Sequence, residues 1–384
     1  MENFPNSQQS TQGFHETQEV TSQFVCDITD AENVWGRLFS LRDNASVCIF
    51  VFYDCLHNDA QDYPEELTEM YTMTKKLGAG NFGEVRLAYK QGTLERCAVK
   101  IMKKKGSQLL LNNIKQINNE IKLLQSVDHP CIIRLQDVID TPEKIYIVME
   151  LAEGGELFDR LTSNKRLPEA TVKFYFFQLA LAVRYLHMRN ITHRDIKPEN
   201  ILLATDEEYT RIKLTDFGLS KLAADASQMT TFCGTPTYIA PELLDFGALS
   251  YTNKVDLWSL GVVLFVSLAC YSPFSATDEA TLRYQIRNAV FSFQHRLWTE
   301  ISEGAKDLIT KLMVSEPSQR LDIEQTLRHP WLQDEVMQKK AMDLLKQDQF
   351  SPSKKRRVEE SEVDELVLPD AKTPKVQLGI SDRL

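Results

Sequence analysis

The chain has 384 residues, of which 43% are hydrophobic and 26% are charged, and its formal net charge is -10. This is the composition of a globular protein with one large or two modest domains. An acidic chain lacks the net basic face that nucleic acid or a membrane surface attracts, so we expect neither as a direct partner.

The seven cysteines are scattered and form no Cys-x-x-Cys pair. An odd, dispersed set favours reduced thiols over a disulfide framework or a zinc site, which fits the cytosol or the nucleus. The N-terminus has neither the basic region nor the apolar region of a signal peptide, so we do not expect secretion.

Residues 1–30 are polar and have no hydrophobic periodicity, so we expect them to be disordered. Within them lie four Ser-Gln or Thr-Gln pairs at nearly regular intervals, more than a Gln-rich composition produces by chance. The pairs begin at Ser7, Thr11, Thr17 and Ser22.

Residues 31–70 contain two strand-like runs, 34–41 and 47–54, joined by a polar bend. Two or three strands cannot bury a core of their own. We therefore expect residues 34–54 to be poorly anchored, with 49–52 as an aggregation-prone edge. Limited proteolysis checks this expectation, which fails if residues 39–53 resist cutting as well as the folded core does.

Alternating apolar and polar residues predict strands from Tyr71 to about Val99. Their first turn contains a G-x-G-x-x-G-x-V pattern, in which glycines let backbone amides approach a phosphate. A dinucleotide-binding turn would open a helix at its third glycine, whereas a strand-like run follows here. The predicted nucleotide contacts are Leu77, Gly78, Gly80, Gly83 and Val85.

The next strand ends at Lys100, which we expect to grip nucleotide phosphates. A lysine without a partner in a narrow cleft would be poorly oriented. Helical spacing over 113–127 places Glu120 near the middle of the following helix, and Glu120 is the predicted partner.

Two later segments have helical patterns. One stripe after Pro168 predicts a helix face packed in the core, and 257–270, which opens beside Asp256, predicts a buried core helix too short to span a membrane. The stripe consists of Val172, Phe176, Leu179, Val183 and Leu186. A strand-rich first part and a helix-rich second part predict an α+β fold with two lobes and a cleft between them.

The chemistry is concentrated in HRDIKPEN at 193–200 and TDFG at 215–218. Phosphoryl transfer needs a base for the incoming hydroxyl, a metal ion on the phosphates and a cation near the transferred group. We predict Asp195 as the base and Lys197 as the cation. Asn200 and Asp216 are the predicted Mg²⁺ ligands.

With these motifs in this order, residues 71–332 resemble the eukaryotic protein kinase domain. The resemblance implies a small β-rich lobe with one helix, a larger helical lobe, and transfer of the ATP γ-phosphate to protein substrates with Mg²⁺. It also implies that adenine meets the backbone at Glu150 and Ala152, and that Glu242 pairs with Arg320. Lys197 is typical of serine/threonine kinases.

The same resemblance implies control and specificity. Thr231 and Thr235, between Asp216 and Glu242, are predicted regulatory phosphorylation sites, although Thr235 has a rival role as a hydrogen-bond partner of the catalytic Asp and Lys. Glu156 and Glu199 are predicted to select an arginine upstream of the target Ser or Thr, and Glu156 to contact the ribose.

Residues 333–384 form a charged tail, in which the basic run 354–357 predicts a nuclear import signal. We therefore expect a nuclear protein, with some in the cytoplasm, that binds an import receptor. Ser/Thr-Gln clusters are typical substrates of the DNA-damage-responsive kinases, which are the expected upstream partners.

Together these features resemble the DNA-damage checkpoint kinases of the calcium/calmodulin-dependent-like group. Those kinases carry a forkhead-associated domain that reads phosphothreonine, of which residues 31–70 resemble a remnant. Recruitment and homodimerisation through phosphothreonine are therefore expected to be lost. Two alternatives stay open: a phosphopeptide-binding scaffold, and a calmodulin-regulated kinase, although the lysines of 334–350 are offset by acidic residues.

Overall fold

The computed structural model describes residues 63–80, 83–93, 95–104, 117–118, 121–163, 166–216, 236–244 and 252–347. The predictions for 1–62 and for 348–384 lie outside the described residues. The chain divides into two compact units, residues 1–99 and 100–384.

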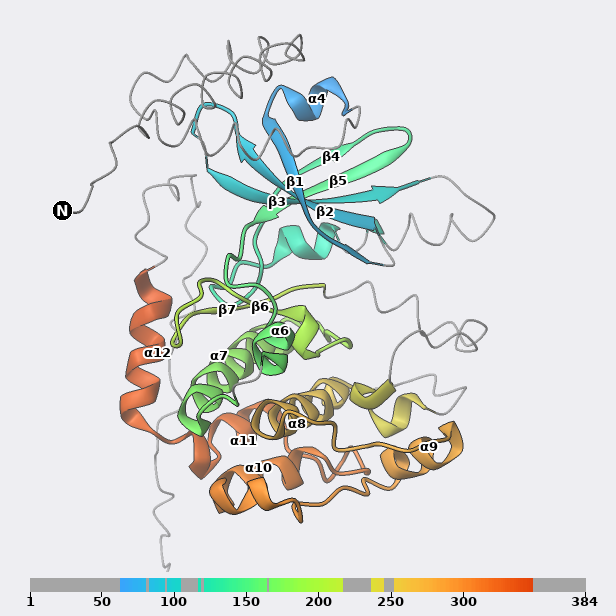
Figure 1. Ribbon diagram of the computed structural model, residues 1–384, viewed down its shortest axis with the longest axis vertical. Helices are drawn as coiled ribbons and strands as arrows, with labels where there is room; N and C mark the ends of the chain where they lie inside the picture. The colour runs from blue at the N-terminus through green and yellow to red at the C-terminus, as the bar shows by residue number, and fades with distance from the viewer. Residues whose placement is uncertain are drawn as a thin grey trace, which may run out of the picture. The chain divides into compact units, whose positions relative to one another are not determined.

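The first unit contains the short helix α4 and the first strands (Figure 1). Their bounds are α4 Glu65–Thr68, β1 Tyr71–Gly80, β2 Gly83–Lys90 and β3 Arg96–Lys103, the last of which continues into the second unit. β1 and β2 pair antiparallel from Tyr71↔Lys90 to Gly80↔Gly83. The predicted strands over 71–99 are confirmed.

The second unit begins with two further strands and continues mainly with helices. Strands β1 to β5 belong to one sheet of order β1-β2-β3-β5-β4, and the boundary between the units falls inside β3. The elements after β3 are β4 Leu135–Asp140, β5 Lys144–Glu150, α6 Leu157–Thr162, α7 Glu169–Met188, η1 Pro198–Asn200, β6 Ile201–Leu203, β7 Ile212–Leu214, η3 Pro236–Tyr238, η4 Pro241–Leu243, α8 Lys254–Ala269, α9 Glu279–Arg287, η5 Arg296–Glu300, α10 Glu303–Leu312, α11 Ile323–Leu327, η6 Pro330–Leu332 and α12 Glu335–Gln347. The predicted strand-rich and helix-rich parts are confirmed.

The core of the second unit is built around α7 and α8. All five residues of the predicted α7 stripe are at most 3% exposed. α8 is buried and mainly apolar, as predicted for 257–270. It approaches α10 so closely at Gly261 that a Cβ there would lie 2.9 Å from Leu312 Cβ. Within the described part of the chain, no helix combines the length and the hydropathy that a membrane span needs.

A buried ion pair ties the segment after η3 to the segment before α11. The Arg320 guanidinium donates to both carboxylate oxygens of Glu242, at 2.8 and 3.0 Å. Its other hydrogen bonds go to the backbone carbonyls of Lys254, Val314 and Ser315. The predicted pairing of Glu242 with Arg320 is confirmed.

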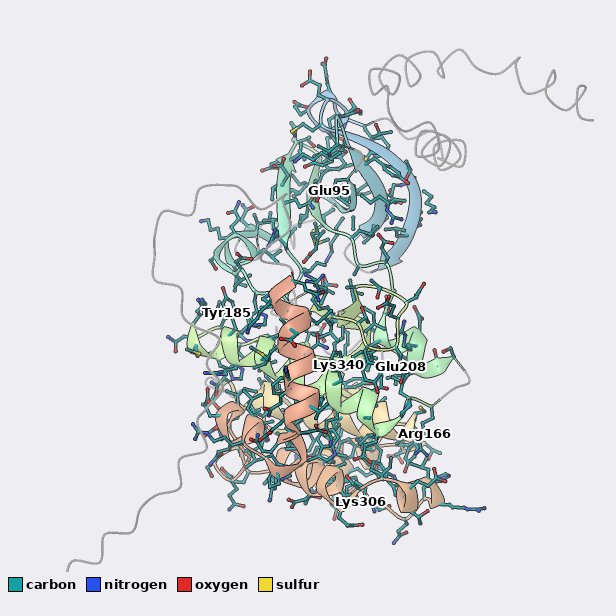
Figure 2. All side chains as sticks on the ribbon, turned by 90° about the vertical axis from the view of Figure 1, so that its left-hand side faces the viewer. Glu95, Arg166, Tyr185, Glu208, Lys306 and Lys340 are labelled. Atoms are coloured by element: carbon teal, nitrogen blue, oxygen red, sulfur yellow. The ribbon has the colours of Figure 1, made fainter. Side chains whose placement is uncertain are left out.

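Helix α12 lies within residues 333–384, which were predicted to be a charged tail. It packs against α7 with Met337, Ala341 and Leu345 buried, one residue per turn on one face. Figure 2 labels Lys340, whose ammonium lies 3.1 Å from the ring centroid of Tyr209. The folded part of the chain therefore continues to Gln347. The sequence pattern did not predict this helix, because its few apolar residues are spaced among many charged ones.

Candidate active site

The predicted glycine turn lies in the first unit, at the ends of β1 and β2. Gly80 pairs with Gly83, whose φ of 140° is open to glycine alone. A Cβ added at Gly78 would meet nothing within 4 Å, and Leu77 is 46% exposed. The backbone at Gly78 is thus uncovered, as the backbone of a phosphate-binding turn must be.

The remaining described site residues lie in the second unit, and Asp195 contacts two of them. Lys197 Nζ donates to its Oδ1 and Oδ2 at 3.0 and 2.8 Å. Asn200 Nδ2 donates to its Oδ2 and to its backbone carbonyl, both at 2.8 Å. The predicted base is therefore held by the two residues predicted to act with it, and its side chain is 34% exposed.

His193 joins this loop to the strand that precedes Asp216. Its Nδ1 accepts from the Asp195 amide at 3.2 Å, so its Nε2 carries the proton that is donated to the Thr215 carbonyl at 3.1 Å. Burial lowers the pKa of His193, which keeps the ring neutral as this pattern needs. Thr215 in turn donates its amide to the Asn200 carbonyl at 3.0 Å.

Asp256 holds the loop 193–200 through two backbone amides, a role that was not predicted from the sequence. Its carboxylate is fully buried in the first turn of α8 and accepts from the amides of His193 and Arg194 at 2.9 and 2.8 Å. His187 Nε2 lies 2.8 Å from it. Arg194 has a φ of 74°, so this acceptor holds a left-handed residue directly before Asp195.

Lys100 contacts the carboxylate of Asp216, so the predicted phosphate-binding lysine and the predicted metal ligand lie together. Asp216 also has a left-handed backbone, with φ 59°. Both residues are in the second unit. Glu120, the predicted partner of Lys100, lies outside the described residues, and that pairing stays a prediction.

Glu150 ends β5 and directs its side chain to protein groups. Its Oε1 accepts from the Arg134 amide at 2.8 Å and from Lys213 Nζ at 2.7 Å. A nucleotide would therefore meet the backbone of Glu150, which is the contact that the kinase resemblance implies. Ala152 follows two residues later and is partly exposed.

Glu156 lies close enough to Glu199 to feel its negative charge. The pKa of Glu156 is raised, first by burial and then by the carboxylates of Asp159, Glu199 and Asp216. Gly154, two residues before Glu156, donates its amide to the Leu203 carbonyl of β6 at 2.9 Å. A Cβ there would lie 2.2 Å from the Thr205 carbonyl oxygen, so this close approach requires glycine. Crowded carboxylates at one site favour a bound cation, as the predicted arginine selection requires.

The six predicted phosphorylation sites lie outside the described residues. They are Thr231, Thr235, Thr11, Thr17, Ser7 and Ser22.

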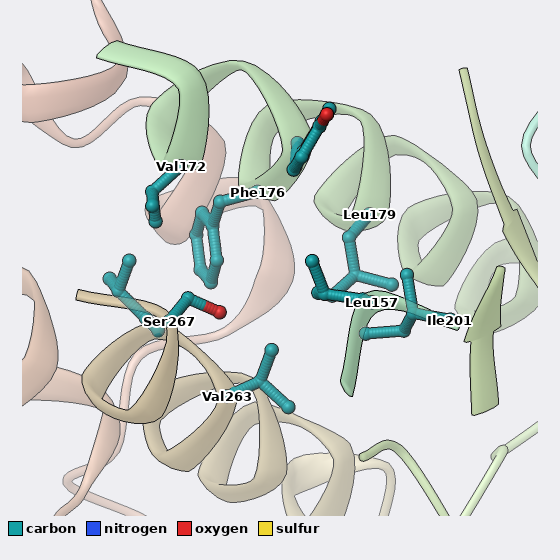
Figure 3. Close-up of a pocket in the computed structure, with 9 residues that line it drawn as sticks. Leu157, Val172, Phe176, Leu179, Ile201, Val263 and Ser267 are labelled. Atoms are coloured by element: carbon teal, nitrogen blue, oxygen red, sulfur yellow. The ribbon is translucent and has the colours of Figure 1, made fainter. Parts of the chain in front are cut away.

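Figure 3 shows a cavity between α6, α7, β6 and α8, lined by apolar side chains and Ser267. Its volume of about 10 Å³ suits one water molecule, so it is not a substrate site.

Comparison with known proteins agrees with this geometry. The family described as "Protein kinase domain" matches residues 71–332. The chain is 43% identical over 305 residues to the ovarian-specific serine/threonine-protein kinase Lok of Drosophila melanogaster, covering 78% of this chain and 64% of Lok. It is 38% identical over 283 residues to the probable serine/threonine-protein kinase fhkC of Dictyostelium discoideum, covering 73% and 47%.

A third relative is human calcium/calmodulin-dependent protein kinase type 1B, at 40% identity over 270 residues, covering 70% of this chain and 77% of the relative. The chain spans less than two thirds of the length of Lok and of fhkC. The shared region nevertheless contains the glycine turn, Lys100, Asp195, Asn200 and Asp216. The chain therefore belongs to the eukaryotic protein kinase family, within its serine/threonine kinases.

Proposed function

We propose that this chain transfers the γ-phosphate of ATP to serine and threonine hydroxyls of proteins in DNA-damage checkpoint signalling. The observation that carries the chemistry is the Asp195 carboxylate, held by Lys197 and Asn200 and linked through His193 to the residue before Asp216. Protein kinases use ATP with Mg²⁺, and the second unit offers suitable groups for both.

The donor set fits Mg²⁺. Asn200 uses its amide nitrogen for Asp195, which leaves the amide oxygen for a cation, and Asp216 offers a carboxylate. Two such protein ligands suit Mg²⁺, which is usually bound by one or two carboxylates plus substrate phosphates. Bound there, Mg²⁺ would neutralise charge on the phosphates.

The residues of the loop have distinct tasks in the proposed reaction. Asp195 orients the Ser or Thr hydroxyl and takes its proton as the oxygen bonds to the γ-phosphorus and the bond to the β-phosphate oxygen breaks. Lys197 lies beside that carboxylate and stabilises charge on the transferred group. Lys100, beside Asp216, holds the other phosphates.

The checkpoint role is supported by sequence features outside the described residues. The Ser/Thr-Gln pairs at 7–23 would accept phosphate from DNA-damage kinases, and the basic run 354–357 would bind an import receptor. With these two terminal segments and the kinase domain between them, the chain resembles checkpoint kinase 2 over nearly its whole length. Phosphosite mapping of residues 1–30 after DNA damage tests this role, and a segment that gains no phosphate contradicts it.

Replacing Glu156 by Gln is expected to raise the KM for an Arg-x-x-Ser peptide roughly tenfold with little change in kcat, because one carboxylate that faces the arginine is lost. The wild-type KM should also rise as the pH is lowered through the raised pKa of Glu156. The same peptide with Ala for Arg is the control. An equal effect on both peptides would show that Glu156 does not select arginine.

Replacing Thr231 by Ala is expected to lower peptide phosphorylation by roughly tenfold or more, because a phosphate there would pair with a cation such as Arg194 and order the activation segment. Ser227→Ala is the matched control. The measurement is the rate of peptide phosphorylation after preincubation with MgATP. Undiminished activity of Thr231→Ala would contradict a regulatory role for this residue.

Calmodulin regulation is the nearest alternative, since one relative is named for it. The apolar face of α12 argues against it, because Met337, Ala341 and Leu345 are buried and unavailable to a partner. Activity that is equal in calcium-calmodulin and in EGTA excludes it. For the scaffold alternative, we expect no binding in a titration with a phosphothreonine peptide.

A further inference from the structure

Lys213, in β7, is a buried lysine for which the proposed reaction has no use. Lys213 is 5% exposed, although a lysine is rarely buried unless it is paired. Its Nζ lies 2.7 Å from Oε1 of Glu150, and the two side chains are 6% and 25% exposed. A buried ammonium of this kind is stable while the carboxylate is present and costly when it is removed.

The carboxylate of Glu150 joins three segments of the second unit. Its Oε1 accepts from Lys213 in β7 and from the amide of Arg134, which directly precedes β4. The Glu150 amide donates to the Arg134 carbonyl at 3.0 Å. Both the side chain and the backbone amide of Glu150 are therefore held at the end of β5. The bond to Lys213 is charge-assisted, which makes it stronger than a neutral hydrogen bond.

Strand β7 is itself held firmly. The Ile133 amide donates to the Leu214 carbonyl at 2.9 Å, and the Leu214 amide donates to the Cys131 carbonyl at 2.8 Å. Asp216 follows Leu214 by two residues. We call residues 149–152, where the kinase resemblance places adenine, the hinge. Lys213 therefore connects the end of β5, where the hinge begins, to the strand that leads into the predicted metal ligand.

The positive charge of Lys213 also acts on His129, a neighbouring buried residue. Burial, then the positive charges of Lys213 and Arg189, lower the pKa of His129 to about 3, so its ring is neutral. The carboxylate of Asp128 contacts the guanidinium of Arg134 at 3.4 Å.

We propose that Lys213 is a positioning residue for the nucleotide, which fixes the peptide groups of the hinge through Glu150. The proposal rests on the proposed function, which places adenine against this backbone. Binding groups must be held within about 0.5 Å of their productive geometry, and an ion pair behind the hinge supplies that restraint. Without Lys213, the Glu150 carboxylate would turn toward water and release the restraint.

The test is titration of the full chain with ADP by calorimetry, with Mg²⁺ and with EDTA. Lys213→Met is expected to weaken ADP about tenfold in both conditions, because the hinge contact does not involve the metal. Lys213→Arg should restore affinity to within about threefold, since it keeps the charge. Lys311→Met, which removes an exposed pair with Asp307, is the matched control and should bind ADP like wild type.

Wild-type affinity in Lys213→Met overturns the proposal, as does a lower melting temperature without any loss of ADP affinity. If Lys213→Met does not fold, Glu150→Gln replaces it: the amide oxygen still accepts from Arg134 but the charge is gone, and several-fold weaker ADP binding is expected. Unchanged affinity of Glu150→Gln then overturns the proposal. A failure of the proposed function can be told apart from a failure of this proposal. In that case the wild-type protein itself would bind no ADP or transfer no phosphate.

Discussion

Replacing Asp195 by Asn is expected to lower the kcat of peptide phosphorylation by about 10²- to 10⁴-fold, the usual contribution of a positioned general base. An amide keeps the size of the side chain, and its one oxygen can still accept from Lys197 and Asn200, but it cannot take the hydroxyl proton. The affinity for ADP should change little, because Asp195 faces the acceptor. Steady-state kinetics with saturating MgATP measure the effect.

Asp206→Asn is the matched control. Asp206 has a side chain that is 93% exposed and 3.9 Å from Arg160, so the same substitution there should leave kcat unchanged. Melting temperatures of both variants should equal that of wild type. A loss in Asp195→Asn below about tenfold, with the fold intact, would remove Asp195 from the role of base.

Replacing Arg320 by Met is expected to lower the free energy of unfolding by about 3–5 kcal/mol, the cost of leaving one partner of a buried ion pair alone. The Arg320 side chain is 0% exposed and that of Glu242 is 17% exposed. Three backbone carbonyls also lose their donor. Urea denaturation followed by tryptophan fluorescence measures the loss, because Trp258 lies 5.3 Å from the guanidinium.

Arg283→Met is the control for this pair. Arg283 contacts Glu279 at 2.8 Å on α9, where the carboxylate side chain is 64% exposed, so its loss should cost below about 1 kcal/mol. The double variant Glu242→Leu/Arg320→Met should be more stable than the sum of the single losses implies. Equal losses for Arg320→Met and Arg283→Met would contradict the structural role of the buried pair.

Local patterns in the sequence predicted the parts of the fold that depend on neighbours along the chain. The α7 stripe has a helical period, and the paired glycines 80 and 83 flank the turn of a hairpin, so both could be predicted from spacing. The loop at 193–200 was readable for the same reason, because Lys197 and Asn200 contact Asp195 within one short segment.

Contacts between distant segments could not be predicted in this way. Asp256 reaches His193 across 63 residues, and Lys213 reaches Glu150 across the same number. Spacing along one strand or helix carries no information about either partner. A signal was nevertheless present, because a charged residue inside an apolar run, such as Asp256 in α8, must find donors in the core.

Transfer of ³²P from γ-labelled ATP to an Arg-x-x-Ser peptide tests the central claim most directly, with wild type and Asp216→Ala assayed side by side. Wild type is expected to label the peptide with Mg²⁺ and not with EDTA, and Asp216→Ala is expected to lose labelling although it stays folded, because a predicted Mg²⁺ ligand and the contact with Lys100 are gone. No labelling by folded wild type, or equal labelling by Asp216→Ala, would contradict the account.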